Sequence, residues 1–272
     1  MDKKLVIIPT YNEKENIADI IAAVFALPGD FHVLVIDDGS PDGTADIVKG
    51  LSAEALSPES SLRDPSHPAD GPLPLTRPRV ATDSGESASA EGRLHLIERS
   101  GKLGLGTAYL TGFRWALDEG FDYIFEMDAD FSHDPKDLLR LHSACADGGA
   151  DLAVGSRYCN GVSVVDWPIG RIIMSYFASA YVRGVLRMHI YDTTAGFVCY
   201  SRKVLQAMNL DAVKMKGYGF QIEMKYTAWK KGFKLVEVPI IFTNRQKGTS
   251  KMSGGIFGEA FWGVMGLRFR KF

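Results

Sequence analysis

Short apolar runs alternate with helix-patterned segments through the first half of the chain. Strands are expected at 5–8, 31–36, 94–98 and 123–127, and helices at 13–26, 44–51 and 106–119. The strand runs are apolar throughout, which indicates strands that are covered on both faces. The repeated order of strand, helix and strand predicts an α/β fold with a mostly parallel central sheet and flanking helices.

The pattern is less regular after residue 151. Strands are expected at 152–155 and 235–241, and helices at 169–186, 202–208 and 220–231. The last segment, 256–272, has apolar residues at helical spacing and a basic end, which predicts an amphipathic helix. No membrane-spanning helix is predicted, because charges interrupt the apolar stretch 164–190 and the stretch 256–267 is short.

One internal segment, 57–92, differs in composition from the rest of the chain. It is rich in Ser, Pro, Ala, Asp and Gly and has almost no apolar clusters. Such a segment cannot bury enough apolar area to offset the entropy of ordering it. We therefore predict a disordered surface insertion, with a lid or a partner-binding loop as the alternative.

The length of 272 residues, 46% of them hydrophobic, fits one large catalytic domain at 1–252 followed by the helical segment 253–272. The net charge of −2 argues against a nucleic-acid-binding protein. Three cysteines, Cys145, Cys159 and Cys199, form no C-x-x-C pair, which favours buried thiols in a reducing compartment over disulfides or zinc. The first apolar run is too short for a signal peptide.

Three polar motifs follow predicted strands: 9–13 (PTYNE), 37–40 (DDGS) and 128–130 (DAD). Ligands of open α/β sheets bind outside the carboxyl ends of the strands, so the motifs predict one site. The spacing of Asp128 and Asp130 points both carboxylates to one side, which suits Mg²⁺ or Mn²⁺. The alternative for this pair is two solvated loop carboxylates.

Other residues near predicted strand ends suit a nucleotide. Asp38 can accept from a ribose hydroxyl or a base N–H, whereas Asp42 and Thr44 favour turn and cap roles. The glycine-rich segment 102–108 either presents N–H groups to an anion or allows close helix packing. Arg157 and the basic run 245–251 suit phosphate groups, with a solvated loop as the alternative for the run.

These motifs, together with 155–158 (GSRY), 192–197 (DTTAGF) and 217–223 (GYGFQIE), resemble glycosyltransferase family 2. Within it, they are most similar to the dolichol- and polyprenol-phosphate mannose synthases. The resemblance covers nearly the whole chain except 57–92. It implies a GT-A fold, the Rossmann-like fold of nucleotide-diphospho-sugar transferases.

The resemblance also implies roles for individual residues. The nucleoside would be held by Pro9, Tyr11, Glu13, Ile36 and Asp38. Asp128 and Ala129 would line the donor site, and the metal would be bound by Asp128, Asp130 and Ser132, where some relatives have Gln at position 132. The donor diphosphate or the acceptor phosphate would be contacted by Arg157, Arg245 and Lys251, which with Asp130 form the expected catalytic set.

The implied reaction is the inverting transfer of mannose from GDP-mannose to a polyprenyl phosphate, at the cytoplasmic face of a membrane. A phosphate nucleophile is already mostly ionised at neutral pH, so no protein general base is required. The segment 167–188 and the helix around Phe261 and Trp262 are expected at the membrane interface. The chain resembles the short form of the family, which leans on such a helix or on a membrane-anchoring partner.

Two alternatives remain open. A family 2 enzyme with another donor, such as UDP-glucose, or with a saccharide acceptor has the same motifs, and a saccharide acceptor would need Asp192 or Glu223 as general base. The chain could instead be a non-catalytic sugar-nucleotide-binding subunit of a membrane complex. The carboxylate pair and the basic run argue against this second alternative, because a silent subunit needs no metal site.

Overall fold

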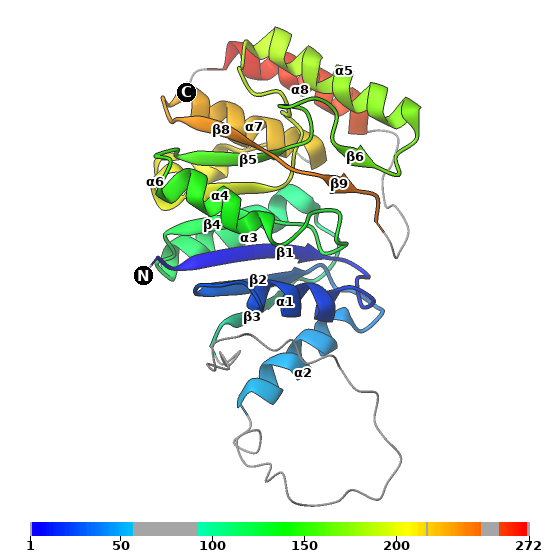
Figure 1. Ribbon diagram of the computed structural model, residues 1–272, viewed down its shortest axis with the longest axis vertical. Helices are drawn as coiled ribbons and strands as arrows, with labels where there is room; N and C mark the ends of the chain where they lie inside the picture. The colour runs from blue at the N-terminus through cyan, green and yellow to red at the C-terminus, as the bar shows by residue number, and fades with distance from the viewer. Residues whose placement is uncertain (1, 57–91, 216, 246–255, 271–272) are drawn as a thin grey trace, which may run out of the picture.

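The computed structural model describes residues 2–56, 92–215, 217–245 and 256–270. The predicted insertion, apart from Gly92, and the predicted site residue Lys251 lie outside these ranges. Figure 1 shows a central sheet with helices on both faces and a further pair of helices, α5 and α8, lying side by side beyond one edge. The α/β architecture predicted from the apolar runs is confirmed.

The central sheet has the strand order β3-β2-β1-β4-β7-β5-β8. Its strands are β1 (Lys4–Thr10), β2 (Phe31–Asp37), β3 (Leu94–Glu98), β4 (Tyr123–Glu126), β5 (Leu152–Ser156), β7 (Val198–Ser201) and β8 (Leu235–Pro239). Within this sheet β7 runs antiparallel to both of its neighbours, and the other pairs are parallel. Two short strands, β6 (Val164–Val165) and β9 (Phe242–Thr243), pair in parallel outside it.

Strand residues alternate between two apolar layers. Leu5 and Ile7 pack on one face beneath α3 (Leu105–Asp118), α6 (Arg202–Ala207) and α7 (Gly217–Lys230). Val6 and Ile8 pack on the other face with α1 (Ile17–Phe25), α2 (Thr44–Leu56) and α4 (Asp137–Ala146). Both faces are therefore covered, which is why the strands are apolar at nearly every position.

A third apolar cluster joins α7 to the helices α5 (Ile169–Leu186) and α8 (Ile256–Phe269). Its members include Val182, Ile222 and Val264. The rings of Tyr181 and Phe261 stack with their centroids 4.9 Å apart. Within the described ranges, no helix is both long and apolar enough to cross a membrane.

Several predicted boundaries differ from the structure. The first helix begins at Ile17 and not at residue 13, because the Glu13 N–H donates to the Thr44 hydroxyl (3.0 Å) instead of entering a helix. The strand expected at 235–241 ends at Pro239, and the chain then pairs with β6. Helix α4 and strand β7 were not predicted. All three cysteines are free thiols, but Cys159 is only partly buried, so its predicted burial was wrong.

Candidate active site

The carboxyl ends of the parallel strands meet at one edge of the sheet. Asp38 follows β2, Asp128 and Asp130 follow β4, and Arg157 follows β5. Strands β4 and β5 both run antiparallel to β7, so they point in the same direction and end at the same edge. The topology therefore brings the predicted motifs together, as expected for the ligand site of an open α/β sheet.

Asp130 is buried and forms an ion pair with Arg245, whose Nη2 atom lies 2.9 Å from Asp130 Oδ2. The Thr243 N–H donates to the Ser132 carbonyl (3.1 Å), which fixes the segment after β9 against the segment after β4. This contact places Arg245 beside the carboxylate pair, although 115 residues separate the two in sequence (245 − 130). Arg245 thus lies beside the carboxylate pair, and its phosphate-binding role stays a prediction.

The two carboxylates are close enough to influence each other. Burial raises the pKa of Asp128 above its usual value, the charge of Asp130 raises it further, and Arg245 opposes the shift. Between them lies Ala129, which is buried. A pair of adjacent carboxylates in this setting is stabilised by a cation, because a cation removes the repulsion that favours protonation.

The backbone after Asp130 turns sharply. Phe131 has a φ of 58°, a left-handed conformation that is strained for a bulky residue. The Ser132 N–H donates to Asp130 Oδ1 (3.1 Å), which fixes the carboxylate that the turn presents. Ser132 is itself buried next to this carboxylate. Strain of this kind persists where the surrounding contacts hold it, often at functional sites.

These residues fit a divalent metal ion. Asp128, Asp130 and the Ser132 hydroxyl supply hard oxygen atoms of the kind that Mg²⁺ and Mn²⁺ bind. Among the described residues, no group of three or more His, Cys, Asp and Glu side chains is arranged to hold a metal. The remaining ligands would therefore come from water and from substrate phosphates, as is usual for Mg²⁺.

The second motif divides its two aspartates between different tasks. Asp37 accepts from the hydroxyls of Thr10 (2.8 Å) and Ser40 (2.5 Å), so it holds the turn together. Asp38 is buried and ion-paired with Arg99, whose Nε atom lies 2.6 Å from Asp38 Oδ1. Asp38, which was predicted to bind the nucleoside, is therefore paired with Arg99 in this structure.

Arg99 was not singled out from the sequence. Besides Asp38, its guanidinium donates to the Thr107 hydroxyl (2.8 Å) and to the Gly104 carbonyl (3.3 Å). It thereby joins β2 to the glycine-rich segment, where Gly104 has a φ of 101° that favours glycine. A Cβ atom at Gly106 would lie 3.0 Å from Phe220, so this glycine serves close helix packing. The sequence signal that could have identified Arg99 is its position directly after β3.

The other predicted nucleoside residues lie along β1 and β2. Pro9 and Tyr11 are partly exposed at the end of β1, and Lys102 Nζ lies 5.1 Å from the Tyr11 ring centroid. Glu13 accepts from the Asn16 side chain (3.0 Å). The side chain of Ile36 is fully buried in the core, next to Asp37 and Asp38 at the end of β2.

The turn role predicted for Asp42 is confirmed. Its carboxylate accepts from the Thr44 N–H (3.0 Å) and the Lys14 N–H (3.1 Å). The Thr44 hydroxyl in turn accepts from the Glu13 N–H, so it links the start of α2 to the 9–13 motif. These contacts fix the loops after β1 and β2 in place.

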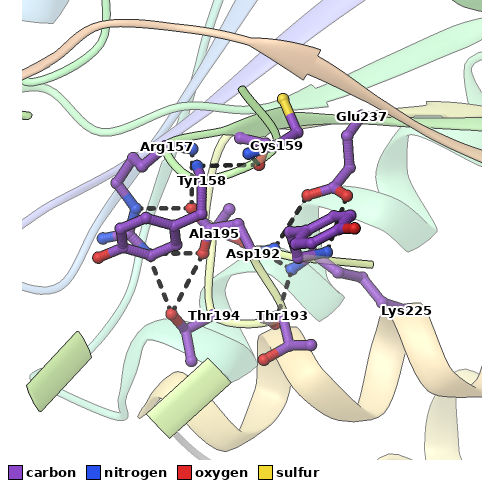
Figure 2. A network of polar contacts seen from close by, with 11 residues as sticks. Arg157, Tyr158, Cys159, Asp192, Thr193, Thr194, Ala195, Lys225 and Glu237 are labelled. Atoms are coloured by element: carbon purple, nitrogen blue, oxygen red, sulfur yellow. Dashed lines mark hydrogen bonds and ion pairs between the residues drawn. The ribbon is translucent and has the colours of Figure 1, made fainter. Parts of the chain in front are cut away.

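Figure 2 shows how Arg157 is held by Asp192. The guanidinium donates through Nε to Asp192 Oδ2 and through Nη2 to Asp192 Oδ1, both at 2.7 Å, and Nη2 also donates to the Thr194 hydroxyl (3.0 Å). The Arg157 N–H donates to the same carboxylate (3.0 Å). Glu237 accepts from the backbone N–H groups of Tyr191 (2.8 Å) and Asp192 (2.9 Å).

Neither acidic candidate for a general base is available for that role. Burial alone would raise the pKa of Asp192, but the charge and hydrogen bonds of Arg157 hold it below its usual value. Glu223 is buried, paired with Arg270, and accepts from the N–H groups of Lys214 (3.0 Å) and Met215 (2.8 Å). Both carboxylates are thus bound within the protein.

A second buried pair lies beneath the site. Burial raises the pKa of Glu126, the last residue of β4, to about 8, and the charge of Lys225 opposes this shift. Burial lowers the pKa of Lys225 to about 8, and the charge of Glu126 opposes that shift in turn. The sequence analysis missed both residues, because a lysine within a helix is normally expected in solvent.

Comparison with known proteins gives a matching family and relatives that align over nearly the whole chain. The family model described as glycosyl transferase family 2 matches residues 5–61 and 83–208. A polyprenol monophosphomannose synthase of Mycolicibacterium smegmatis is 44% identical over 97% of this chain and 88% of its own length. An undecaprenyl-phosphate mannosyltransferase of Micrococcus luteus is 40% identical over 98% of both chains.

Solved structures with this fold include glucosyl-3-phosphoglycerate synthase of Mycobacterium tuberculosis. Its complex with Mn²⁺, uridine diphosphate and phosphoglyceric acid superimposes with a TM-score of 0.65 over 98% of this chain and 79% of the other. The complex with uridine diphosphate alone gives a TM-score of 0.61. Both are 14% identical to this chain, so the likeness concerns the fold alone.

Proposed function

Because the chain belongs to glycosyl transferase family 2 and has the expected GT-A fold, we propose that it transfers mannose from GDP-mannose to a polyprenyl phosphate. The names of two relatives, 44% and 40% identical over nearly the whole chain, specify mannose and a polyprenol or undecaprenyl-phosphate substrate. The products would be polyprenyl-phosphate mannose and GDP. GDP-mannose is proposed as the donor because the motifs resemble those of the mannose synthases.

One observation of the structure carries the choice of acceptor. Asp192 and Glu223, the two carboxylates considered as general bases, are both bound in buried ion pairs. A saccharide hydroxyl needs a base to remove its proton, whereas a phosphate monoester has a second pKa of about 6 and is mostly ionised at neutral pH. The site therefore suits a nucleophile that arrives already charged.

The proposed reaction is an in-line displacement. An oxygen of the lipid phosphate forms a bond to the anomeric carbon, while the bond from that carbon to the donor's β-phosphate oxygen breaks. GDP leaves with the electron pair, and attack from the opposite face inverts the anomeric configuration. A bound Mg²⁺ or Mn²⁺ would neutralise the charge that develops on the leaving diphosphate.

The chain's own residues would divide the work. Asp128 and Asp130, with Ser132 beside them, would hold the metal at the end of β4. Arg245 already contributes a positive charge there, and Arg157 and Lys251 would add charge for the two phosphate-bearing substrates. Tyr11, Glu13 and Asp38 would hold the nucleoside at the ends of β1 and β2, supported by Pro9, Ala129 and Ile36.

A lipid acceptor requires contact with a membrane surface, and α5 and α8 present a suitable face. Exposed apolar side chains include Ile169 (74% exposed) and Phe177 (65%) on α5, and Trp262 (74%) on α8. Arg171 lies over the Trp167 ring at 3.8 Å, which places a cation beside these apolar groups. We expect the catalytic domain, 1–252, to rest on the cytoplasmic face through α5 and the segment 253–272.

The proposal is tested by radiolabel transfer. Purified protein is incubated with polyprenyl-phosphate-containing vesicles, Mg²⁺ or Mn²⁺, and labelled GDP-mannose or labelled UDP-glucose in parallel. We expect label in the lipid extract from GDP-mannose alone. Label from UDP-glucose would keep the reaction and replace the donor, and no label from either donor would contradict the proposed acceptor.

A further inference from the structure

Lys225 is fully buried in the middle of α7 and is surrounded by backbone oxygens. Its ammonium donates to the carbonyls of Ala195 (2.6 Å), Gln221 (3.2 Å) and Thr193 (3.3 Å). The side-chain oxygen Oε1 of Gln221 also lies 3.4 Å from Lys225 Nζ. An ammonium group has three N–H donors, so these contacts use its full capacity.

Two of the three carbonyls belong to the loop that holds Arg157. This loop, residues 192–196, lies between α5 and β7 and carries Asp192, which binds the Arg157 guanidinium at two points. Figure 2 shows Lys225 on the side of this loop opposite to Arg157. The loop is thus held between two cations, and one of them, Arg157, lies near enough to Asp128 to lower the pKa of that carboxyl.

The charge of Lys225 is matched by Glu126 and Asp192, both fully buried, whose electrostatic attraction favours the charged ammonium. The side chains of Gln221 and Tyr200 also face Glu126, and their hydrogen bonds favour its charged form. Glu126 lies on β4, two residues before Asp128. The ammonium of Lys225 on α7 is therefore attracted both to Asp192 in the 192–196 loop and to Glu126 at the end of β4, just before the carboxylate pair.

We infer that Lys225 is a positioning residue for the reaction: by binding the Thr193 and Ala195 carbonyls, it fixes the loop whose Asp192 aims Arg157 at the active site. This inference rests on the proposed function, because it assigns Arg157 a phosphate-bearing substrate. Lys225 touches no substrate in this arrangement and acts through Arg157. Nothing in the residue pattern of α7 distinguishes it from an ordinary surface lysine.

The test is a double-mutant cycle on transfer activity. Lys225→Met keeps the length of the side chain and removes its charge and donors, and Arg157→Lys keeps the charge and removes the two-point contact with Asp192. We expect each single variant to lower kcat/KM at least about tenfold, and the double variant to be little worse than either, because residues that act as a unit are not additive. Lys231→Met, an exposed site just after α7, is the matched control and should stay within about twofold.

A second variant separates positioning from folding. Glu126→Gln/Lys225→Met removes both buried charges and so relieves the unpaired charge that Lys225→Met leaves behind. Activity is compared per amount of cooperatively folded protein, measured by urea unfolding. We expect this variant to regain stability without regaining activity. Recovery of activity would overturn the inference, since Lys225 would then serve only to neutralise Glu126.

The outcomes also separate this inference from the proposed function. If the wild-type protein transfers no mannose to polyprenyl phosphate, the proposed function fails before any variant is compared. If the wild type is active and the effects of Lys225→Met and Arg157→Lys simply multiply, the proposed function stands. In that case Lys225 does not act through Arg157, and the positioning role is wrong.

Discussion

The guanidinium of Arg245 lies 2.9 Å from the carboxylate of Asp130, at the point where the segment after β9 meets the end of β4. The pair joins an acidic and a basic motif that are far apart in the sequence. Arg245 offsets part of the charge of the Asp128 and Asp130 pair. Asp128 and Asp130 would hold a divalent ion at this point, and the ion would neutralise negative charge on the substrate phosphates.

Asp130→Asn is expected to lower mannosyl transfer by about 100-fold or more, because it removes a charged metal ligand while keeping the shape of the side chain. Binding of GDP in the presence of Mn²⁺, measured by calorimetry, should weaken in parallel. Asp134→Asn, at an exposed position four residues later, is the control. Transfer by Asp130→Asn at the wild-type rate would exclude Asp130 from the metal site.

Asp192→Ala is expected to lower the free energy of unfolding by about 3–5 kcal/mol, because it leaves the Arg157 guanidinium buried without its partner. Urea unfolding measures this. Glu98→Gln breaks the exposed pair with Lys49 and should leave the urea midpoint nearly unchanged, because solvent screens exposed ion pairs. A variant Asp192→Ala that is inactive but as stable as the wild type would instead point to Asp192 as a general base.

The sheet was largely predictable from the sequence because each strand is buried on both faces and therefore reads as an apolar run. Strand β7, Val198–Ser201, was missed because its antiparallel place between β4 and β5 depends on contacts distant in sequence. Helix α4 does show a signal, with Leu138, Leu141 and Cys145 buried along one face.

The location of the site could be predicted from the sequence, but the ion pairs within it could not. The motifs after the strands could be assigned to one edge from the topology alone. The partners of Asp38 and Asp192 could not, because Arg99 and Arg157 reach them across 61 and 35 residues of sequence. The burial of Lys225 could not be predicted from the sequence either, because it arises from the packing of α7 between the sheet and the helices α5 and α8.

The stability of the fold is expected to fall as the pH drops below about 6.5, in part through His32 and His95. Their rings stack, with His32 Nδ1 3.3 Å from His95 Nε2, so one of these nitrogens must be unprotonated. Burial lowers the pKa of both side chains, and His32 lowers that of His95 further. The unfolded chain therefore binds more protons than the folded one below the ordinary histidine pKa, which favours unfolding in acid.

Urea unfolding midpoints between pH 7.5 and 5 measure this effect. His95→Phe keeps an aromatic ring against Trp115 and removes one titrating group, so its midpoint should change less with pH than that of the wild type. An equal or steeper dependence in His95→Phe would show that this pair does not contribute to the acid sensitivity.

Ile173→Ser/Phe177→Ser is expected to weaken binding to vesicles that contain anionic lipid by at least about tenfold. Both side chains are exposed on α5, and burying one apolar side chain in the interface is worth about 1.5–3 kcal/mol. Vesicle co-sedimentation measures the binding, and Phe177→Leu, which keeps an apolar side chain, should bind nearly as well as the wild type. Unchanged binding of the double variant would remove α5 from the membrane-facing surface.

The most direct test of the central claim compares two acceptors that differ only in the phosphate. Purified protein is given labelled GDP-mannose and Mn²⁺ with either polyprenyl phosphate or the corresponding free polyprenol. We predict labelled lipid from polyprenyl phosphate alone, because a lipid phosphate is already ionised whereas Asp192 and Glu223, the two carboxylates considered as general bases, are held in buried ion pairs. Labelled lipid from the free polyprenol at a comparable rate would contradict the account.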